Sequence, residues 1–288
     1  MKIIFFGSSN FSVMVLNELV ENGLNPSLVV TTPDSEKGRG QKSSPNDVKE
    51  WATNRDIPFV QPNTLAEITK TLENTKSDFF IIAAYGKIIP EEILKLPKYG
   101  ALCVHPSLLP RWRGSSPVQA TILAGDKLAG VSIIELDKKV DHGPILAQKE
   151  FRLTEKETAS ELNTLLWPEG GKLLTKILKD PQDSLRNKKE QDHAQATFSK
   201  KIEKPEGLID SQLITKGGNS IEVTLAERKV RALNPDPGVY TIFKTSTKDI
   251  RVKILEAKIE NDKFVPVFVV PEGKRKMSWE EFLRGNKI

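Results

Sequence analysis

The sequence has almost no cysteine and little histidine. Cys103 is the single cysteine, and the three histidines are His105, His142 and His193. One cysteine excludes an intramolecular disulfide and a zinc site built from several thiolates. The histidines are too few and too widely spaced along the chain to indicate a metal site, so we predict none.

A long uninterrupted apolar segment is also missing. No stretch approaches the about 18 apolar residues that a membrane-spanning helix requires. The amino-terminal MKIIFFGSSNF has one lysine and a short run ending at Gly7, without the apolar core and cleavage site of a secretory signal. We therefore expect a cytoplasmic protein with no membrane partner.

The loop after the first apolar run lacks the three-glycine fingerprint of dinucleotide-binding proteins. Its sequence, Gly7-Ser8-Ser9-Asn10-Phe11, holds a single glycine. A Rossmann-type order of strands is therefore no reason to expect NAD here. We interpret the loop as an ordinary strand-to-helix turn.

The first half of the chain alternates short apolar runs with segments of helical spacing. This pattern is typical of an α/β fold with a mainly parallel sheet wrapped by helices. We predict strands at Ile3–Phe6, Leu28–Thr32, Phe79–Ala84, Ala101–Val104 and Gly130–Leu136, and helices at Ser12–Glu21, Pro45–Asn54 and about 155–179. Pro45 after Ser43-Ser44 resembles a helix cap followed by a proline in the first turn.

The second half of the chain predicts a separate small domain. Gln182–Gln195 is polar and poor in hydrophobic residues, which is typical of a linker. A helix is expected at Ser220–Ala232, followed by short strands at Val239–Phe243, Val252–Ala257 and Phe264–Val270. With 288 residues, we predict a large domain at 1–190, a linker at 191–205 and a small β-rich domain at 206–288.

Positive charge is concentrated in the small domain. Residues 201–288 hold 17 Lys and Arg against 13 Asp and Glu, whereas residues 1–200 hold 26 against 25. The cluster Lys274-Arg275-Lys276 and the basic loop Lys37–Lys42 are suited to an RNA backbone, because neutralising phosphates dominates such binding. The alternative is that both are solvated surface charge.

The densest motif lies just after the predicted strand Ala101–Val104. It reads His105-Pro106-Ser107-Leu108-Leu109-Pro110-Arg111-Trp112-Arg113-Gly114. Open α/β sheets bind ligands at the carboxyl ends of their strands, so a site is expected here. His105 is suited to donate to a carbonyl oxygen or move a proton, with Asp141 orienting it. A structural role for His105 is the alternative, and Trp112 either stacks on a base or covers the core edge.

These segments together resemble the formyltetrahydrofolate-dependent formyltransferases, specifically the branch that acts on methionyl-initiator tRNA. The resemblance is carried by HPSLLPRWRGSSPVQ and by FFGSSNFSVMVLNEL, TTPDSEKGRGQKSSP, AAYGKIIPEEIL, VDHGPIL, ATFSKKIEKPEGLID, VRALNPDPGVY and GKRKMSWEEFLRG. It covers nearly the whole chain. It implies a Rossmann-like formyltransferase domain followed by a small, β-rich, OB-like domain.

The resemblance also implies the chemistry. The amino group of methionine on initiator tRNA attacks the formyl carbon of the co-substrate 10-formyltetrahydrofolate, and no metal takes part. The family's catalytic positions fall on Cys103, His105 and Asp141. Folate is expected beside Tyr85, Gly86, Ser107, Leu108, Leu109 and Pro110. Contacts to tRNA are expected from Lys37, Arg39, Lys42, Arg231, Lys274, Arg275 and Lys276, and the protein is expected to be a monomer.

Three departures from the family pattern affect these expectations. The family has asparagine where this chain has Cys103, and a thiol is a weaker hydrogen-bond donor than an amide. In its carboxyl-terminal motif the family has an aromatic residue flanked by prolines, and this chain has Asp236 at that position. The stretch between Ile259 and Pro271 is shorter, which predicts at least one missing hairpin and exposed strand edges.

Two alternative functions therefore stay open. One is an RNA-binding homologue that has lost catalysis through Cys103. The other is a formyltransferase that acts on an amino-sugar nucleotide.

Overall fold

The computed structural model describes residues 1–37, 42–244, 249–286 and 288. They form two compact units. The first, which we call the sheet unit, comprises Met1–Ser115, Ala129–Phe151 and Asn163–Ser199. The second, which we call the C-terminal unit, comprises Ser116–Leu128, Arg152–Leu162 and Lys200–Ile288. The division into 1–190, 191–205 and 206–288 remains a prediction.

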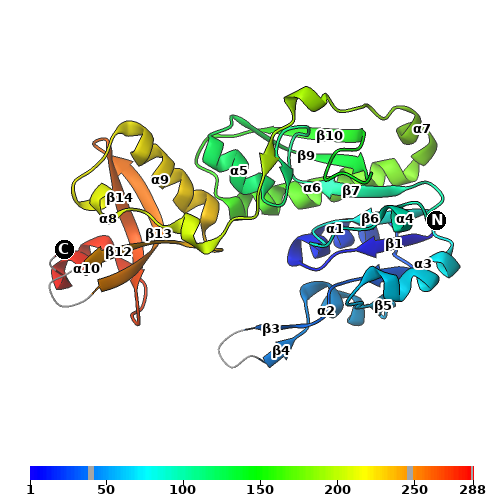
Figure 1. The fold of residues 1–288 in the computed structure, drawn as a ribbon, viewed down its shortest axis with the longest axis horizontal. Coiled ribbons are helices and arrows are strands. Elements are labelled where there is room, and N and C mark those ends of the chain that lie inside the picture. Colours follow the sequence, from blue (N-terminus) through cyan, green and yellow to red (C-terminus); the bar gives the residue numbers. More distant parts are fainter. Residues whose placement is uncertain (38–41, 245–248, 287) are drawn as a thin grey trace. The chain divides into compact units, whose positions relative to one another are not determined.

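A seven-stranded sheet forms the centre of the sheet unit (Figure 1). Its spatial order is β10–β9–β7–β6–β1–β2–β5, with bounds Ile145–Arg152, Leu128–Glu135, Ala101–His105, Phe79–Ile82, Ile3–Phe6, Leu28–Val30 and Phe59–Val60. The strands from β7 to β5 are parallel, and β9 is antiparallel to β7. The central strands read as continuous apolar runs because helices cover both faces. The predicted α/β fold is confirmed.

Helices α1 (Asn10–Glu21), α2 (Asp47–Thr53) and α6 (Ala159–Lys179) share one core with the sheet. The 3-10 turn η1 (Leu65–Ile68) and helices α3 (Thr69–Thr75) and α4 (Glu91–Leu94) share the core of the other face. Alternate residues of β1 therefore point to different cores, Phe5 to the first and Phe6 to the second. This alternation follows from the period of two along a strand.

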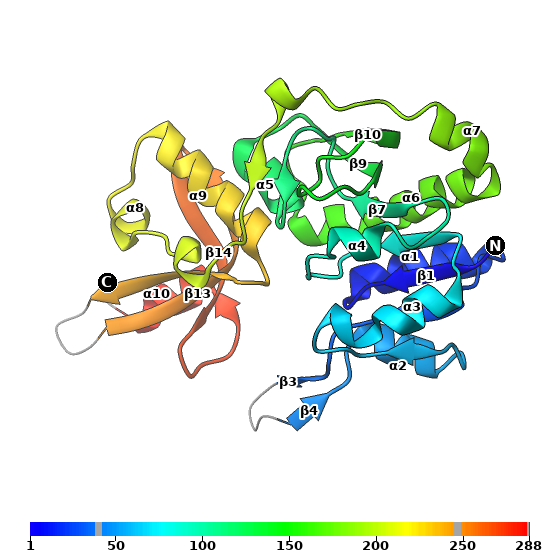
Figure 2. The ribbon, with the colours of Figure 1, turned by 45° about the vertical axis from the view of Figure 1, so that its right-hand side comes forward.

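The cap of α2 differs from the prediction. The cap residue is Asn46, whose side chain accepts a hydrogen bond from the Lys49 backbone N–H, and the helix starts at Asp47. The predicted cap at Ser43-Ser44 was wrong because those residues belong to β4 (Lys42–Ser44), which pairs with β3 (Ser35–Lys37). Figure 2 shows this hairpin leaving the sheet.

Helix α6 lies unusually close to its neighbours at two adjacent glycines. A Cβ placed on Gly170 would lie 2.4 Å from Val104 Cγ1, and one placed on Gly171 would lie 2.8 Å from Glu18 Cβ. Val104 belongs to β7, which carries the motif residue His105, and Glu18 belongs to α1. The two glycines thus let one helix pack closely against both the sheet and α1.

The C-terminal unit is built on an antiparallel sheet, ordered β12–β13–β14–β15. The strands span Val239–Lys244, Asp249–Glu260, Lys263–Pro271 and Met277–Ser278. Its helices are α5 (Pro117–Ala124), α8 (Ser211–Thr215), α9 (Ser220–Leu233) and α10 (Trp279–Gly285), with the turn η3 (Lys204–Gly207). Val223, Val230, Val252, Phe264 and Phe282 are buried in it. The predicted small β domain is confirmed, and its described strands form an open sheet.

The remaining elements of the sheet unit are short. They are β8 (Arg113–Gly114), α7 (Pro181–Arg186), η2 (His193–Gln195) and β11 (Phe198–Ser199). Across the described ranges of the chain, no helix combines the length and apolar character needed to cross a membrane.

Candidate active site

His105 is the last residue of β7, at the carboxyl end where a site is expected. Its side chain is buried, with Nε2 3.0 Å from the backbone oxygen of Trp112 and Nδ1 3.5 Å from Asp141 Oδ2. A carbonyl and a carboxylate only accept hydrogen bonds. A ring protonated at both nitrogens therefore satisfies both neighbours.

Asp141 lies in the loop between β9 and β10, and its backbone is in the left-handed region. Its φ is 46°, in the left-handed region that costs a non-glycine residue of the order of 1–3 kcal/mol. Its Oδ2 accepts a 2.8 Å hydrogen bond from the Gly114 backbone N–H. The structure therefore brings together Asp141 and His105, as predicted, and adds the Gly114 N–H, which gave no signal in the sequence.

Cys103 lies two residues before His105, so the two side chains share one face of β7. Its Sγ donates a weak 3.7 Å hydrogen bond to the Val104 oxygen. Burial raises the pKa of the Cys103 thiol well above its usual range, and the negative charge of Asp141 acts in the same direction. The side chain is therefore a neutral thiol, which is a weak donor and a poor nucleophile.

Side chains of β9 and β10 form hydrogen bonds with the backbone of the motif loop from Ser107 to Leu109. Ser132 Oγ donates to the Ser107 oxygen at 2.6 Å and accepts from the Leu109 N–H at 3.1 Å. Gln148 Nε2 donates to the Leu109 oxygen at 2.9 Å, and Ser107 Oγ donates to the Arg111 oxygen at 2.7 Å. These bonds fix the backbone of the residues that were predicted to touch folate, Ser107, Leu108, Leu109 and Pro110.

The other side of the motif loop is paired with a segment far along the chain. Strand β11 is parallel to β8, the Trp112 N–H donates to Thr197 Oγ1 at 2.9 Å, and Ser199 Oγ donates to the Arg113 oxygen at 3.2 Å. A Cβ on Gly114 would lie 2.2 Å from the Ser199 oxygen, so only glycine fits at that φ of +106°. We call this pairing the β8–β11 brace.

A cluster of side chains supports Asp141 from behind. The buried Arg113 guanidinium donates to Gln191 Oε1 from Nε at 3.1 Å and from the terminal NH2 at 2.7 Å, and to His193 Nδ1 at 2.9 Å. Gln191 Nε2 donates to the backbone oxygens of Asp141 at 2.9 Å and Gly143 at 2.7 Å. Burial lowers the pKa of Arg113. Nothing in the polar sequence around residue 191 predicted this cluster.

Two of the three histidines stack beside the cluster. The His142 and His193 rings lie 4.0 Å apart at 11°, and His142 Nδ1 is 2.6 Å from Asp137 Oδ2. Since Arg113 can only donate, His193 Nδ1 is the acceptor and carries no hydrogen. In the described residues, no group of three or more His, Cys, Asp or Glu side chains is arranged to hold a metal.

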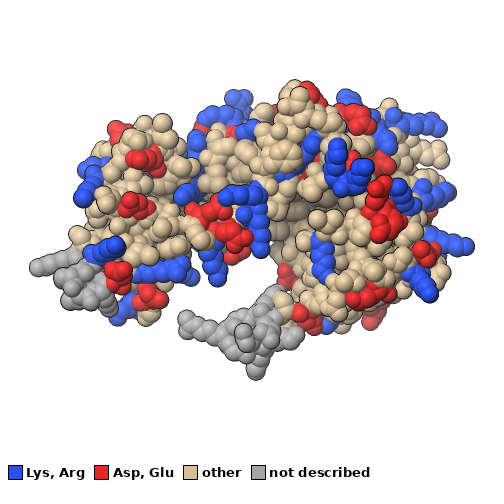
Figure 3. Space-filling model, viewed as in Figure 1, with Lys and Arg blue, Asp and Glu red and all other residues tan. Residues whose placement is uncertain are grey.

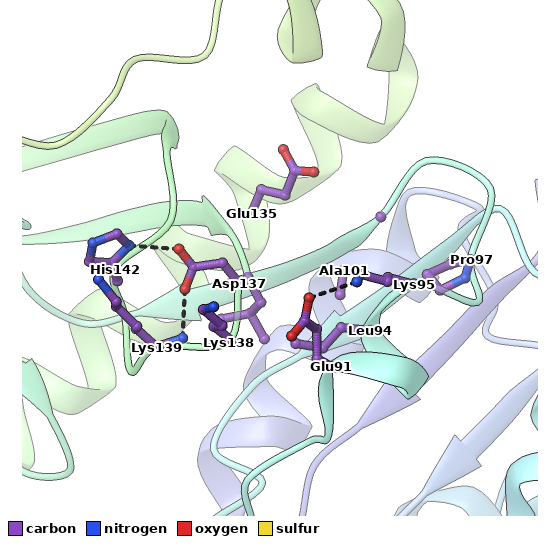
Figure 4. A pocket seen from close by; sticks show the side chains of 12 residues that line it. Glu91, Leu94, Lys95, Pro97, Ala101, Glu135, Asp137, Lys138, Lys139 and His142 are labelled. Carbon is purple, nitrogen blue, oxygen red and sulfur yellow. Dashed lines mark hydrogen bonds and ion pairs between the residues drawn. The ribbon is translucent and has the colours of Figure 1, made fainter.

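A cavity of about 470 Å³ lies at the amino end of β7, opposite the carboxyl end that carries His105 (Figure 4). Its lining is formed by Glu91, Leu94, Lys95, Pro97, Gly100, Ala101, Glu135, Leu136, Asp137, Lys138, Lys139 and His142. Within it Glu91 pairs with Lys95 at 2.6 Å. Ala101 lies on the same face of β7 as Cys103 and His105, so one strand face links the cavity to the histidine.

The two other predicted folate residues, Tyr85 and Gly86, follow β6 and precede α4, which contributes residues to the lining of this cavity. Tyr85 is buried in the core that also contains Ile93 and Leu94, and burial raises its pKa to about 12. Gly86 is exposed with a φ of +77°.

The residues predicted to contact tRNA have different surroundings. The backbones of Lys37 and Lys42 end β3 and begin β4, and Arg39 lies outside the described residues. Arg231 is mostly buried, pairs with Glu227 at 2.6 Å and donates to the Glu157 oxygen, which favours a structural role. Lys274, Arg275 and Lys276 are exposed. On the face shown in Figure 3, basic and acidic side chains are interspersed.

Comparison with known proteins gives consistent results. Residues 1–178 match the family model described as formyl transferase. The chain is 40% identical over 262 residues to a methionyl-tRNA formyltransferase of a Sulfurihydrogenibium species, covering 90% of this chain and 80% of the relative. It is 32% identical to one of Dictyoglomus thermophilum, covering 100% and 98%.

A solved structure has the same fold. The N-formyltransferase of Helicobacter canadensis, determined with folinic acid and dTDP-3-aminofucose, matches with a TM-score of 0.63 over 91% of this chain and 88% of that one. The sequence identity is 20%, so this likeness concerns the fold alone.

Proposed function

The chain belongs to the formyl transferase family, and from this premise we propose that it transfers a formyl group from 10-formyltetrahydrofolate to the amino group of methionyl-initiator tRNA. The relatives that match over most of their length are methionyl-tRNA formyltransferases. The observation that carries the chemistry is the placement of His105 and Asp141 against each other at the end of β7. The protein is accordingly an enzyme that serves translation initiation.

In the reaction the amine nitrogen attacks the formyl carbon, and the carbonyl π electrons move to oxygen. His105 Nε2 lies 3.0 Å from the Trp112 oxygen, whereas Nδ1 lies 3.5 Å from Asp141 Oδ2, so we assign the more loosely held Nδ1–H as the donor to that oxyanion. When the C–N10 bond breaks, the electron pair returns from oxygen to carbon and N10 leaves with the bonding pair. The amine must lose a proton and N10 must gain one, and we propose that Asp141 accepts the amine proton and returns it to N10 as the C–N10 bond breaks.

Cys103 is a weaker contributor than the asparagine of the family. A neutral thiol donates poorly, and loss of one well-placed oxyanion donor costs about 10²–10³ in rate in other enzymes. The burial of Cys103 also disfavours a covalent formyl-cysteine intermediate, because the thiolate is disfavoured. We therefore assign oxyanion stabilisation mainly to His105.

The cavity at residues 91–142 is the best candidate for the folate ring system. Its volume lies in the about 300–1,000 Å³ range of small-molecule sites, and its lining combines apolar side chains with the Asp137–His142 pair (Figure 4). Tyr85, Gly86 and Ser107–Pro110 remain proposed folate contacts.

For tRNA we propose the exposed Lys274, Arg275 and Lys276 and the loop residues Lys37, Arg39 and Lys42. Arg231 is the weakest member of the predicted set, because its guanidinium already pairs with Glu227. We further propose that the protein acts as a monomer in the cytoplasm.

Mass measurement of formyl incorporation tests this function. Methionyl-initiator tRNA incubated with the protein should gain one formyl group only when 10-formyltetrahydrofolate is present. An amino-sugar nucleotide offered as competitor should not reduce the yield. No gain in mass with authentic substrates would refute the assignment and favour an RNA-binding homologue, whereas formylation of the sugar would favour the other alternative.

A further inference from the structure

We propose that Gln191 is a positioning residue that holds the backbone of Asp141 so that its carboxylate meets both the Gly114 N–H and His105. This inference rests on the proposed function for its kinetic part. Gln191 touches none of the reacting groups of the proposed mechanism, so its effect would pass through Asp141.

The first support is the complete use of the Gln191 side chain. The residue is 5% exposed, its amide oxygen accepts twice from Arg113, and its amide nitrogen donates to the Asp141 and Gly143 oxygens. One amide group therefore satisfies both carbonyls around Asp141 and a buried guanidinium. Because buried polar groups cost free energy when unpaired, these bonds fix the turn in one place.

The second support is the conformation that must be held. Asp141 has a φ of 46°, which an aspartate adopts only against a local energetic cost. The turn is also closely packed at Gly143, since a Cβ there would lie 1.9 Å from the Glu135 oxygen. The bonds from Gln191 reach the backbone on both sides of His142, and so oppose relaxation of this turn.

The third support is the anchoring of Gln191 itself. On one side, Lys189 exchanges two 2.8 Å backbone hydrogen bonds with Ile145 at the start of β10. On the other side, the β8–β11 brace fixes Thr197 and Ser199. Gln191 is thus presented from a segment held at both ends, as a group that must position another residue requires.

The choice of variant isolates the donor half of the amide. Gln191→Glu keeps an acceptor for Arg113 but turns a carboxylate oxygen toward the two carbonyl oxygens, which repels the Asp141 turn. Gln182→Glu is the matched control, since Gln182 is exposed on α7. Gln191→Asn, which keeps the amide but shortens its reach by one carbon, is the second variant should the first fail to fold.

Kinetics give one arm of the test. Gln191→Glu should lower kcat by about 10²-fold, as small misplacements of catalytic groups do, with KM for the folate donor little changed. In an Asp141→Asn background the same substitution should cost no more than about twofold, because residues acting as one unit are not additive. Equal losses in both backgrounds would overturn the proposal in favour of a merely structural role.

Nuclear magnetic resonance gives an arm that needs no activity. With three histidines in the chain, the His105 ring signals can be assigned by substitution. Asp141→Asn and Gln191→Glu should both displace them, and Gln182→Glu should not. Unmoved His105 signals in Gln191→Glu would refute the positioning role. A wild-type protein without formyl transfer would refute the proposed function, while this arm still decides the role of Gln191.

Discussion

The two ring nitrogens of His105 face the Trp112 oxygen and the Asp141 carboxylate, and the same carboxylate accepts from the Gly114 N–H. These contacts hold both side chains in place. Substituting either with alanine should lower kcat by about 10²–10⁴-fold, the usual contribution of a positioned acid or base. The variants should still fold, because the core is elsewhere. Initial rates and thermal unfolding check this, with exposed Asp183→Ala as control. Near-normal turnover in either variant would remove it from the site.

Cys103 stands at a position where the resemblance to the family implies asparagine, so we expect its replacement to change the rate in a defined direction. Cys103→Asn should raise kcat by restoring an amide N–H to the oxyanion. Cys103→Ser should keep at least the rate of the parent, because a hydroxyl donates a hydrogen bond at least as well as a thiol. Single-turnover rates with methionyl-tRNA check both variants.

A nucleophilic Cys103 would give the opposite pattern. The serine variant would then be nearly inactive, and the parent would accumulate a formylated protein with folate donor alone, visible as added mass. The raised pKa of the partly buried Cys103 thiol argues for the first pattern at neutral pH, since thiolate forms only as the pH approaches that raised value. Alkylation of Cys103 should accordingly be slow in the native protein and fast after unfolding.

At the scale of single elements, the close packing of helix α6 against the sheet at Gly170 can be tested. Alanine normally stabilises a helix relative to glycine by about 1 kcal/mol. Gly170→Ala should instead destabilise the protein by about 1–3 kcal/mol, because its Cβ would overlap Val104 and Val131. Denaturant unfolding measures the difference. Gly285→Ala in α10, where a Cβ meets nothing within 4 Å, is the control, and equal stability of the two variants would contradict the tight packing.

The elements divide clearly into those that the sequence predicts and those that it does not. Strands such as β1 and β6 are continuous apolar runs between turn residues, so their positions follow from composition. Gln191 lies in a polar stretch without periodicity, and its partner Arg113 is 78 residues away. Only tertiary structure brings such pairs together. The positive φ of Asp141 is invisible for the same reason.

The cap of α2 shows a second limit. Ser43, Ser44 and Asn46 are all acceptable cap residues, and Pro45 between them suits the first turn of a helix. Ser43 and Ser44 pair with β3 as part of β4, and Asn46 is the residue that caps the helix. Local preference was therefore overruled by strand pairing.

At the scale of the whole molecule, the excess of positive charge in residues 201–288 predicts how tRNA binding responds to salt. Replacing Lys274, Arg275 and Lys276 with glutamine should flatten the dependence of log affinity on log salt by about 0.7–0.9 per lost phosphate contact. Arg39→Ala should weaken binding or misplace the acceptor end. Filter binding over a salt series measures the slope.

The control for this prediction replaces Lys2, Lys70 and Lys76, which are exposed lysines of the sheet unit, with glutamine. This change removes the same charge from another region. If both triple variants shift the slope equally, the effect is one of net charge. If the first leaves it unchanged, the cluster at 274–276 is a solubilising surface.

The β8–β11 brace joins residues 86 positions apart, and this spacing has a consequence for protein synthesis. The ribosome makes His105 and the motif loop long before it makes Thr197 and Ser199, although folding proceeds from the amino terminus as the chain emerges. The strands β1, β2, β6 and β7 are all available early. A nascent chain arrested before residue 199 would therefore hold its central parallel strands with an unbraced motif loop, so the catalytic groups are among the last parts of the sheet unit to reach their working positions.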